Sequence, residues 1–428
     1  MLKNIGWMTI ATLLRLGAGF VLFIFLAREL GPANFGLLAY WLAFASLLAL
    51  IVNYGFGLQL LRELGRNRDA ASTVIGATVS AKLVLTVIVV VAGAAIGFQE
   101  NGRPEIFWPL LGMALAESFA EHLNYILRAL GLFDKEARFA LATTAINFLG
   151  VLIPLFVFKT LTAVALGFLV SRVVSLMVNW QLSAPFLPKL KQPLDFSIRA
   201  IRTTLSDGFP YAADMAVSTL NSTLDVLLLS YMAGPKAVGV YQAGLKLTQG
   251  ANSIAPIVGN VYIPHIASKQ AQKIDCRREA ASLILKMAVL GGGMGAVLAL
   301  GNNLITTLLF GTDYLELAVL LPWFGLALCL RFVAAGFGIN LTAHGMQSVR
   351  VVTNVFAVIV LLTVAMITVP VFGAVGMLMA FVASTSLVGS AYFSALIWKK
   401  IPIGINFLNL VVIGIFIISI VSQISGTR

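Results

Sequence analysis

The segment ARELGPANFGLLAY, residues 27–40, joins two apolar stretches that are each long enough for a membrane-spanning helix. A related segment, SYMAGPKAVGVYQA, occupies residues 230–243 in the second half of the chain. In both, a Gly-Pro pair is followed by a glycine four residues after the proline. Glycine commonly ends one helix and proline commonly begins the next. The sequence therefore predicts two related helical bundles in a parallel repeat, whose axis lies along the membrane normal.

The composition is typical of a membrane protein. Hydrophobic residues make up 59% of the chain and charged residues 11%, and the mean hydropathy is +0.96. A helix that crosses the hydrocarbon core needs about 20 mainly apolar residues, and about 13 such stretches occur along the chain. We therefore expect an all-α polytopic membrane protein with about 12–14 transmembrane helices.

The division of the chain is expected at its one long polar loop. Residues 183–208 contain prolines and several basic residues, whereas the other loops are short. We predict an N-terminal helical bundle at residues 1–182, a basic cytoplasmic linker at 183–208 and a C-terminal helical bundle at 209–398. An additional hydrophobic helix is expected within residues 399–428.

Lysine and arginine residues in the short loops predict the orientation of the chain. With the N-terminus inside, most of them fall on the cytoplasmic side, in agreement with the positive-inside rule. This asymmetry beside anionic lipids explains most of the net charge of +12 without nucleic acid. We therefore expect a multi-pass protein with a cytoplasmic N-terminus, in contact with membrane lipids and not with nucleic acid.

No pattern typical of catalysis stands out in the sequence. Cys276 and Cys329 fall in a basic loop and in an apolar stretch, which argues against a disulfide or a metal site. Neither a catalytic triad nor a nucleotide-binding loop is found. We expect a transporter without its own ATPase, and neither an enzyme nor a protein with a cofactor or metal.

Three of the apolar stretches carry polar residues at helical spacing. A helix turns by roughly 100° per residue, so residues 4, 7 and 11 apart share one face. The three stripes are Glu117, Glu121, Asn124 and Arg128; Asp214, Ser218, Asn221 and Asp225; and Gln242, Lys246, Gln249, Ser253 and Asn260. Ionisable groups that face lipid cost several kcal/mol each, so the stripes predict a shared wet interior.

The predicted interior holds more cationic than anionic side chains. A cationic lumen suits an anionic substrate, because guanidinium groups match phosphate oxygens. The candidate residues for a substrate with pyrophosphate and sugar groups are Arg15, Lys82, Arg128, Lys246, Arg331, Asn221, Gln242 and Gln249, and those for ion coupling are Glu117, Glu121, Asp214 and Asp225. A structural alternative remains for some of them: Glu121 pairs with Arg128 or Lys82 to join helices, and Arg172 extends to the membrane interface.

Residues 4–64 resemble the opening of the polysaccharide-biosynthesis transporters, the Wzx-type lipid-linked oligosaccharide flippases of the MATE-like MOP superfamily. The resemblance rests on an arginine in the aromatic-containing first helix and on the AR-x-LGP-xx-FG turn at 27–36. It also rests on LDVLLLSYMAGPKAVGVYQAGLKL at 224–247, although LSYMAG lacks the first glycine usual there. The resemblance implies two six-helix lobes around a central cleft, and it favours Arg15, Asp225 and Lys246 in or near that cleft.

The function implied by this resemblance is transport of an undecaprenyl-pyrophosphate-linked oligosaccharide by alternating access. It implies a place in the bacterial cytoplasmic membrane, a role in O-antigen or exopolysaccharide synthesis, and a polysaccharide polymerase with its assembly machinery as candidate partners. Coupling to protons or sodium ions is left open.

Other activities also remain open at this point. A cation-coupled multidrug exporter of the same superfamily would be expected to have an acidic, aromatic-lined cleft, and the basic residues argue against it. A membrane polymerase or ligase acting on lipid-linked glycans commonly needs a large outer loop, and the expected outer loops are short. A peptidoglycan-precursor flippase usually has two further helices.

Overall fold

The computed structural model describes residues 2–67, 71–97, 103–187, 194–272 and 274–399, together with positions 401, 414, 417, 420–422 and 424. The secondary structure in these ranges is helical, without strands. Seven helical stretches of the described chain are long and apolar enough to cross a membrane. The predicted all-α polytopic membrane fold is therefore confirmed.

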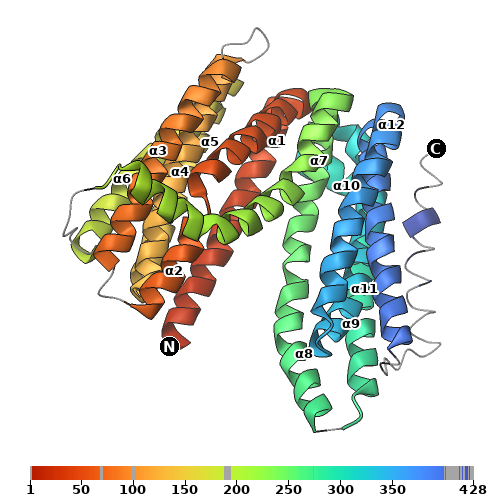
Figure 1. Ribbon diagram of the computed structural model, residues 1–428. Helices are drawn as coiled ribbons and strands as arrows, with labels where there is room; N and C mark the ends of the chain where they lie inside the picture. Colours follow the sequence, from red (N-terminus) through yellow and green to blue (C-terminus); the bar gives the residue numbers. More distant parts are fainter. Residues whose placement is uncertain are drawn as a thin grey trace. The chain divides into compact units, whose positions relative to one another are not determined.

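The helices follow one another with short connections (Figure 1). The first half contains α1 (Leu2–Asn53), α2 (Phe56–Arg66), α3 (Ala71–Gly97), α4 (Pro104–Ala129), α5 (Phe133–Phe158), α6 (Leu161–Ser183) and the short η2 (Ala184–Phe186). The second contains α7 (Ile198–Asn252), α8 (Ile254–Ala271), α9 (Arg277–Leu300), α10 (Asn302–Ile305), η3 (Thr306–Phe310), η4 (Thr312–Tyr314), α11 (Leu315–Ala343) and α12 (Gln347–Trp398). Three of the longer helices, α4, α7 and α8, are not among the seven apolar stretches, and these three carry the polar stripes.

Single glycines break three of the long helices. Gly31 in α1, Gly234 in α7 and Gly373 in α12 have φ angles of 70°, 80° and 54°, a region that glycine adopts without steric cost. Divided at these glycines, and with α8 continuing α7 past Ser253, the described residues form twelve long helical segments. Six of them lie in α1–α6, where the 11-residue α2 is not counted, and six lie in α7–α12, as a two-times-six arrangement requires. Most of the additional helix expected within 399–428 lies outside the described residues.

The chain divides into two compact units. Unit 1 contains Met1–Leu30 and Leu37–Leu227, and unit 2 contains Gly31–Gly36 and Leu228–Arg428. This division differs from the expected boundary at 183–208, because the beginning of α7 packs within unit 1. There the Nη1 atom of Arg62 donates a hydrogen bond to the hydroxyl of Tyr211 over 3.0 Å. The residue bounds of two functional bundles therefore remain a prediction.

Each unit is built around helices that are covered on several sides. In unit 1, α4 and α5 pack on α6, and α2 packs on α4. In unit 2, α11 is the central helix, because α8, α9 and α12 all pack on it. Its most apolar window is 78% buried, whereas that of α5 is 11% buried, so α5 leaves most of its apolar surface for lipid.

The two Gly-Pro segments meet inside unit 2. A Cβ atom placed on Gly36 would overlap the carbonyl oxygen of Pro235, and one placed on Gly239 would overlap that of Pro32. The contact is thus reciprocal, which is the pattern that two-fold related surfaces produce. It confirms that the repeated motif occupies equivalent places in the two halves and explains the glycine at its end.

Candidate functional site

One cavity of unit 1, here called the polar cavity, collects the polar stripe of α4. It has a volume of about 270 Å³ and lies among α1, α4, α5 and α6. Its polar and charged lining residues are Arg15, Glu117, Glu121, Asn124, Arg128, Thr143, Thr144, Asn147, Arg172, Ser175 and Asn179. The predicted common face of α4 is therefore confirmed, while the roles proposed for its residues stay predictions.

Two ion pairs join α4 to its neighbours. In the first, Arg172 Nε on α6 lies 2.7 Å from Glu117 Oε2. In the second, Arg128 donates from Nε to Glu136 Oε1 of α5 over 2.7 Å. Arg128 is therefore bound by Glu136 and not by Glu121. Arg172 lines the polar cavity and does not extend to the membrane interface as in the structural alternative. Each pairing compensates charges that would be costly to leave unpaired between packed helices.

Amide and hydroxyl groups form the remainder of the polar cavity's wall. Asn179, which is 2% exposed, donates from Nδ2 to Asn124 Oδ1 over 3.1 Å. The Ser175 hydroxyl donates to Asn147 Oδ1 over 3.0 Å. Asn147, Ser175 and Asn179 were not among the predicted site residues. The signal was present, because Arg172, Ser175 and Asn179 follow one another at helical spacing on α6.

A second cavity of unit 1, here called the lysine cavity, has a volume of about 170 Å³. It brings Lys82 of α3 together with Glu121 of α4 and Asp214 of α7. Lys82 is 1% exposed, and its Nζ atom donates to Asn53 Oδ1 over 3.1 Å. The same Asn53 oxygen accepts from the Ser118 hydroxyl over 2.6 Å. The Lys82 side chain is thus held in place inside the helix bundle.

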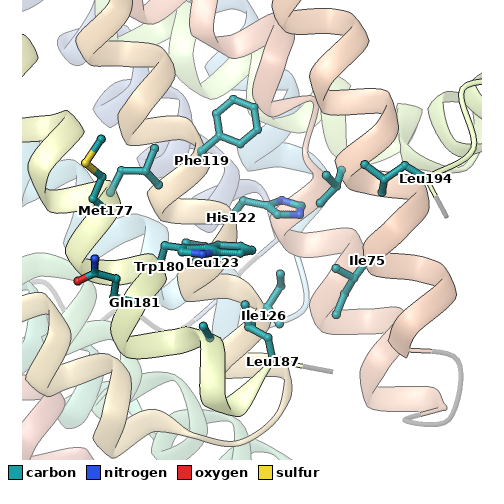
Figure 2. Close-up of a pocket in the computed structure, with 13 residues that line it drawn as sticks. Ile75, Phe119, His122, Leu123, Ile126, Met177, Trp180, Gln181, Leu187 and Leu194 are labelled. Atoms are coloured by element: carbon teal, nitrogen blue, oxygen red, sulfur yellow. The ribbon is translucent and has the colours of Figure 1, made fainter. Parts of the chain in front are cut away.

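A third cavity of unit 1, the apolar cavity, is larger, at about 950 Å³. Figure 2 shows the side chains of Phe119, Leu123, Met177 and Trp180 around it. His122 also lines it and lies 3.5 Å from the Thr78 hydroxyl, measured from Nε2 to Oγ1. This cavity could not be predicted from the sequence, because an apolar helix face beside a cavity has the same composition as one beside lipid.

The other candidate residues have separate positions. In unit 1, Asp225 is half-buried, and its Oδ1 atom accepts from the backbone N–H of Val226. In unit 2, Lys246 donates from Nζ to Gln249 Oε1 over 2.9 Å, Gln242 is half-buried and Arg331 is exposed on α11. The side chain of Asn221 lies outside the described residues. A wet interior shared by all three stripes stays a prediction.

Metal ligands do not gather in the described part of the chain. Within it, no group of three or more His, Cys, Asp and Glu residues could hold a metal ion. Cys276 and Cys329 are both free and buried. The residues that line the three cavities offer hydrogen-bonding, charged and apolar groups.

The sequence profile of the polysaccharide biosynthesis proteins matches residues 1–270. The chain belongs to the polysaccharide biosynthesis protein family. This membership confirms the relationship expected from residues 4–64 and 224–247. The matched region contains all of α1–α6 and α7, and hence every helix of unit 1 that lines the three cavities.

The chain is also similar to proteins whose names describe transporters and flippases. An Escherichia coli (strain K12) protein named "Putative O-antigen transporter" is 24% identical over 313 residues, which cover 68% of this chain and 71% of that protein. Among solved structures, "Lipid II flippase MurJ, inward closed conformation" has a TM-score of 0.73 at 13% identity, with 97% of both chains covered. An inward-facing multidrug resistance MATE family transporter of the MOP superfamily has a TM-score of 0.64 at 15% identity, with 94% of this chain and 98% of that chain covered. The two structures establish the fold that this family member shares with them.

Proposed function

We propose that this protein is a flippase that moves an undecaprenyl-pyrophosphate-linked oligosaccharide across the bacterial cytoplasmic membrane for surface polysaccharide synthesis. The family match over residues 1–270 carries the proposal. The O-antigen relative and the fold shared with a lipid II flippase support it. Transport proceeds by alternating access, and the N-terminus is cytoplasmic. A polysaccharide polymerase and its assembly machinery receive the product, and the protein itself forms and breaks no covalent bond.

The physical task is to carry a pyrophosphate through hydrocarbon. Cationic side chains held inside the helices replace part of the hydration shell that the pyrophosphate loses. Lys82 is suited to this, because it is buried and fixed by Asn53. Lys246 is a further candidate in unit 2, whereas the charge of Arg128 is balanced by Glu136, and Arg15 shares the polar cavity with the carboxylate of Glu121. The remaining candidates for binding the substrate are Arg331, Gln242 and Gln249.

Coupling to an ion gradient requires a carboxylate that changes its state during the cycle. Glu117 is bound by Arg172, so Glu121 and Asp214 in the lysine cavity are better placed to take up a proton or sodium ion. Asp225 is the third candidate. The ion drives transport only if its affinity differs between the inward and outward states.

A multidrug exporter of the same superfamily remains the alternative class. Exporters of organic cations need acidic or aromatic surfaces in the substrate path. The buried Lys82 is unfavourable for a cationic substrate, because like charges repel strongly inside the membrane. No observation specifically favours that alternative.

The test is the surface polysaccharide of a bacterial strain that lacks this protein. The strain is complemented with the wild type, with Arg15→Ala, with Lys246→Ala or with the control Lys236→Ala, whose exposed side chain pairs with Glu316. We expect the wild type and the control to restore the polysaccharide, and the first two variants to leave lipid-linked oligosaccharide on the inner leaflet. Normal surface polysaccharide in the deletion strain, with no redundant transporter present, would refute the proposal. Drug sensitivity of the same strain would then be measured.

A further inference from the structure

We infer that the polar cavity of unit 1 binds one neutral sugar ring of the transported glycan, apart from the cations that accept the pyrophosphate. The inference rests on the proposed function and adds the part of the substrate that this cavity recognises. Its evidence is the charge balance, the hydrogen-bonding groups, the size and the rigidity of the cavity.

The charges that line the polar cavity cancel once Glu136, the partner of Arg128 next to it, is included. Among the described residues, Arg172 is paired with Glu117, and Arg128 is paired with Glu136. One cation, Arg15, and one anion, Glu121, complete the charged lining. A site for pyrophosphate needs an excess of positive charge, as in other sites where arginine recognises phosphate. A balanced site favours a ligand that carries no net charge.

The uncharged groups supply separate donors and acceptors. Asn124 and Asn147 each use Oδ1 to accept a hydrogen bond, and among the described residues neither Nδ2 group makes a further one. The hydroxyls of Thr143 and Thr144 donate to the carbonyl of Ala140 in their own helix, so their oxygens can still accept. A sugar hydroxyl both donates and accepts, and it matches a wall that offers both.

The size of the polar cavity fits a single ring. Its volume of about 270 Å³ lies below the roughly 300–1,000 Å³ of sites for larger small molecules. Phe148 and Leu22 also line it and provide apolar surface. The C–H faces of a pyranose are apolar while its rim is hydroxylated, so a cavity with both kinds of surface suits it better than an all-polar one.

The amides are held in place before any ligand enters. Asn179 and Ser175 are 2% and 3% exposed, and they fix the orientations of Asn124 and Asn147 respectively. Asn179 is itself fixed, because its Oδ1 accepts from the Ser183 hydroxyl over 3.1 Å. Groups that need no ordering on binding lose less entropy, which favours recognition of a weakly held neutral ligand.

The test is saturation-transfer NMR on the full-length protein in lipid nanodiscs. The probes are the neutral methyl glycosides of glucose, galactose, mannose, rhamnose and N-acetylglucosamine, together with methyl glucuronide and inorganic pyrophosphate. The variants are Asn147→Ala and Asn124→Ala, and the control is Gln181→Ala on α6, which lines the apolar cavity instead. We expect at least one neutral glycoside to bind. Each variant should weaken its binding about fivefold, the effect of one lost neutral hydrogen bond, and the control should not.

Three results would overturn the inference. These are no binding of any neutral glycoside to the wild type, binding confined to methyl glucuronide or pyrophosphate, and neutral binding that neither variant changes. Asn147→Asp serves as a second variant with nearly the same volume, and its unfolding temperature shows whether lost binding reflects lost folding. Vesicle transport of lipid-linked oligosaccharide separates the two proposals. Transport without sugar binding in the polar cavity refutes this inference alone, and sugar binding without transport refutes the proposed function.

Discussion

Substitution of Gly239 by alanine tests the contact between the two Gly-Pro segments of unit 2. The added Cβ would overlap the carbonyl oxygen of Pro32 and would lie 3.1 Å from the backbone nitrogen of Gly36. All of these are backbone atoms, so no flexible side chain can move aside. The two segments must separate, and we expect a clear loss of stability.

The size of the stability loss follows from how far the two Gly-Pro segments must move apart. A gap of about 1 Å between packed atoms forfeits up to about half of their dispersion attraction. Overpacking of this kind costs about 1–3 kcal/mol in the free energy of unfolding. Alanine also favours a helix over glycine by roughly 0.5–1 kcal/mol, which offsets part of the cost. The free energy of unfolding lost in Gly239→Ala is therefore the overlap cost less the gain from the higher helix preference of alanine.

Gly293→Ala isolates the overlap from the helix preference. Gly293 lies inside α9, and a Cβ placed there meets nothing within 4 Å. This control should be as stable as the wild type or more stable. The assay is denaturant unfolding in mixed micelles, and the two variants should differ by the full overlap cost of about 1–3 kcal/mol.

Because the contact is reciprocal, substitution of Gly36 should have the same effect as substitution of Gly239. Gly36→Ala should destabilise the protein as Gly239→Ala does, and the double variant should lose less than the sum, because the first substitution has already separated the segments. If Gly239→Ala were as stable as Gly293→Ala, the close contact at the repeated motif would be refuted. Additive losses would show that the two glycines act at separate places.

The remaining predictions concern charged side chains. A double-mutant cycle on Arg172 and Glu117 should give a coupling of about 0.5–3 kcal/mol in unfolding free energy, and additive effects would contradict their ion pair. Lys82→Met keeps roughly the shape of the buried side chain but removes its hydrogen bond to Asn53, so it should lower the free energy of unfolding by about 1–3 kcal/mol, and vesicle transport should fall about tenfold or more. Unchanged transport would exclude Lys82 from the substrate path. Lys236→Gln should change the unfolding free energy by at most about 1 kcal/mol, and less at high salt, because its pair with Glu316 is exposed; a larger loss would mean that the pair is shielded from solvent.

The helical architecture could be predicted because its signals are local. Apolar length identified the spans, and the Gly-Pro segments at Gly31 and Gly234 located the interruptions of α1 and α7. The unit boundary could not be predicted in the same way. It follows from contacts between residues far apart in the sequence, such as that of Arg62 with Tyr211, 149 residues away, and nothing in either local sequence indicates that they meet.

The candidate site was predictable where it follows a helix face. The spacing of Glu117, Glu121 and Asn124 placed them together, and all three line the polar cavity. The partners of these residues were not predictable, because helical spacing fixes a face and not the neighbour it contacts. Arg128 therefore pairs with Glu136 of α5, whereas helical spacing had offered Glu121 of its own helix as the partner.

The polar groups of α4 also determine how unit 1 must assemble. The four stripe residues of α4 make it too polar to count among the apolar stretches, so it gains little by meeting lipid alone. Its charges and amides are matched by Glu136 of α5 and by Arg172 and Asn179 of α6. The three helices therefore stabilise one another as a group. A fully apolar α4 would remove this dependence, and it would also remove the groups that line the polar cavity.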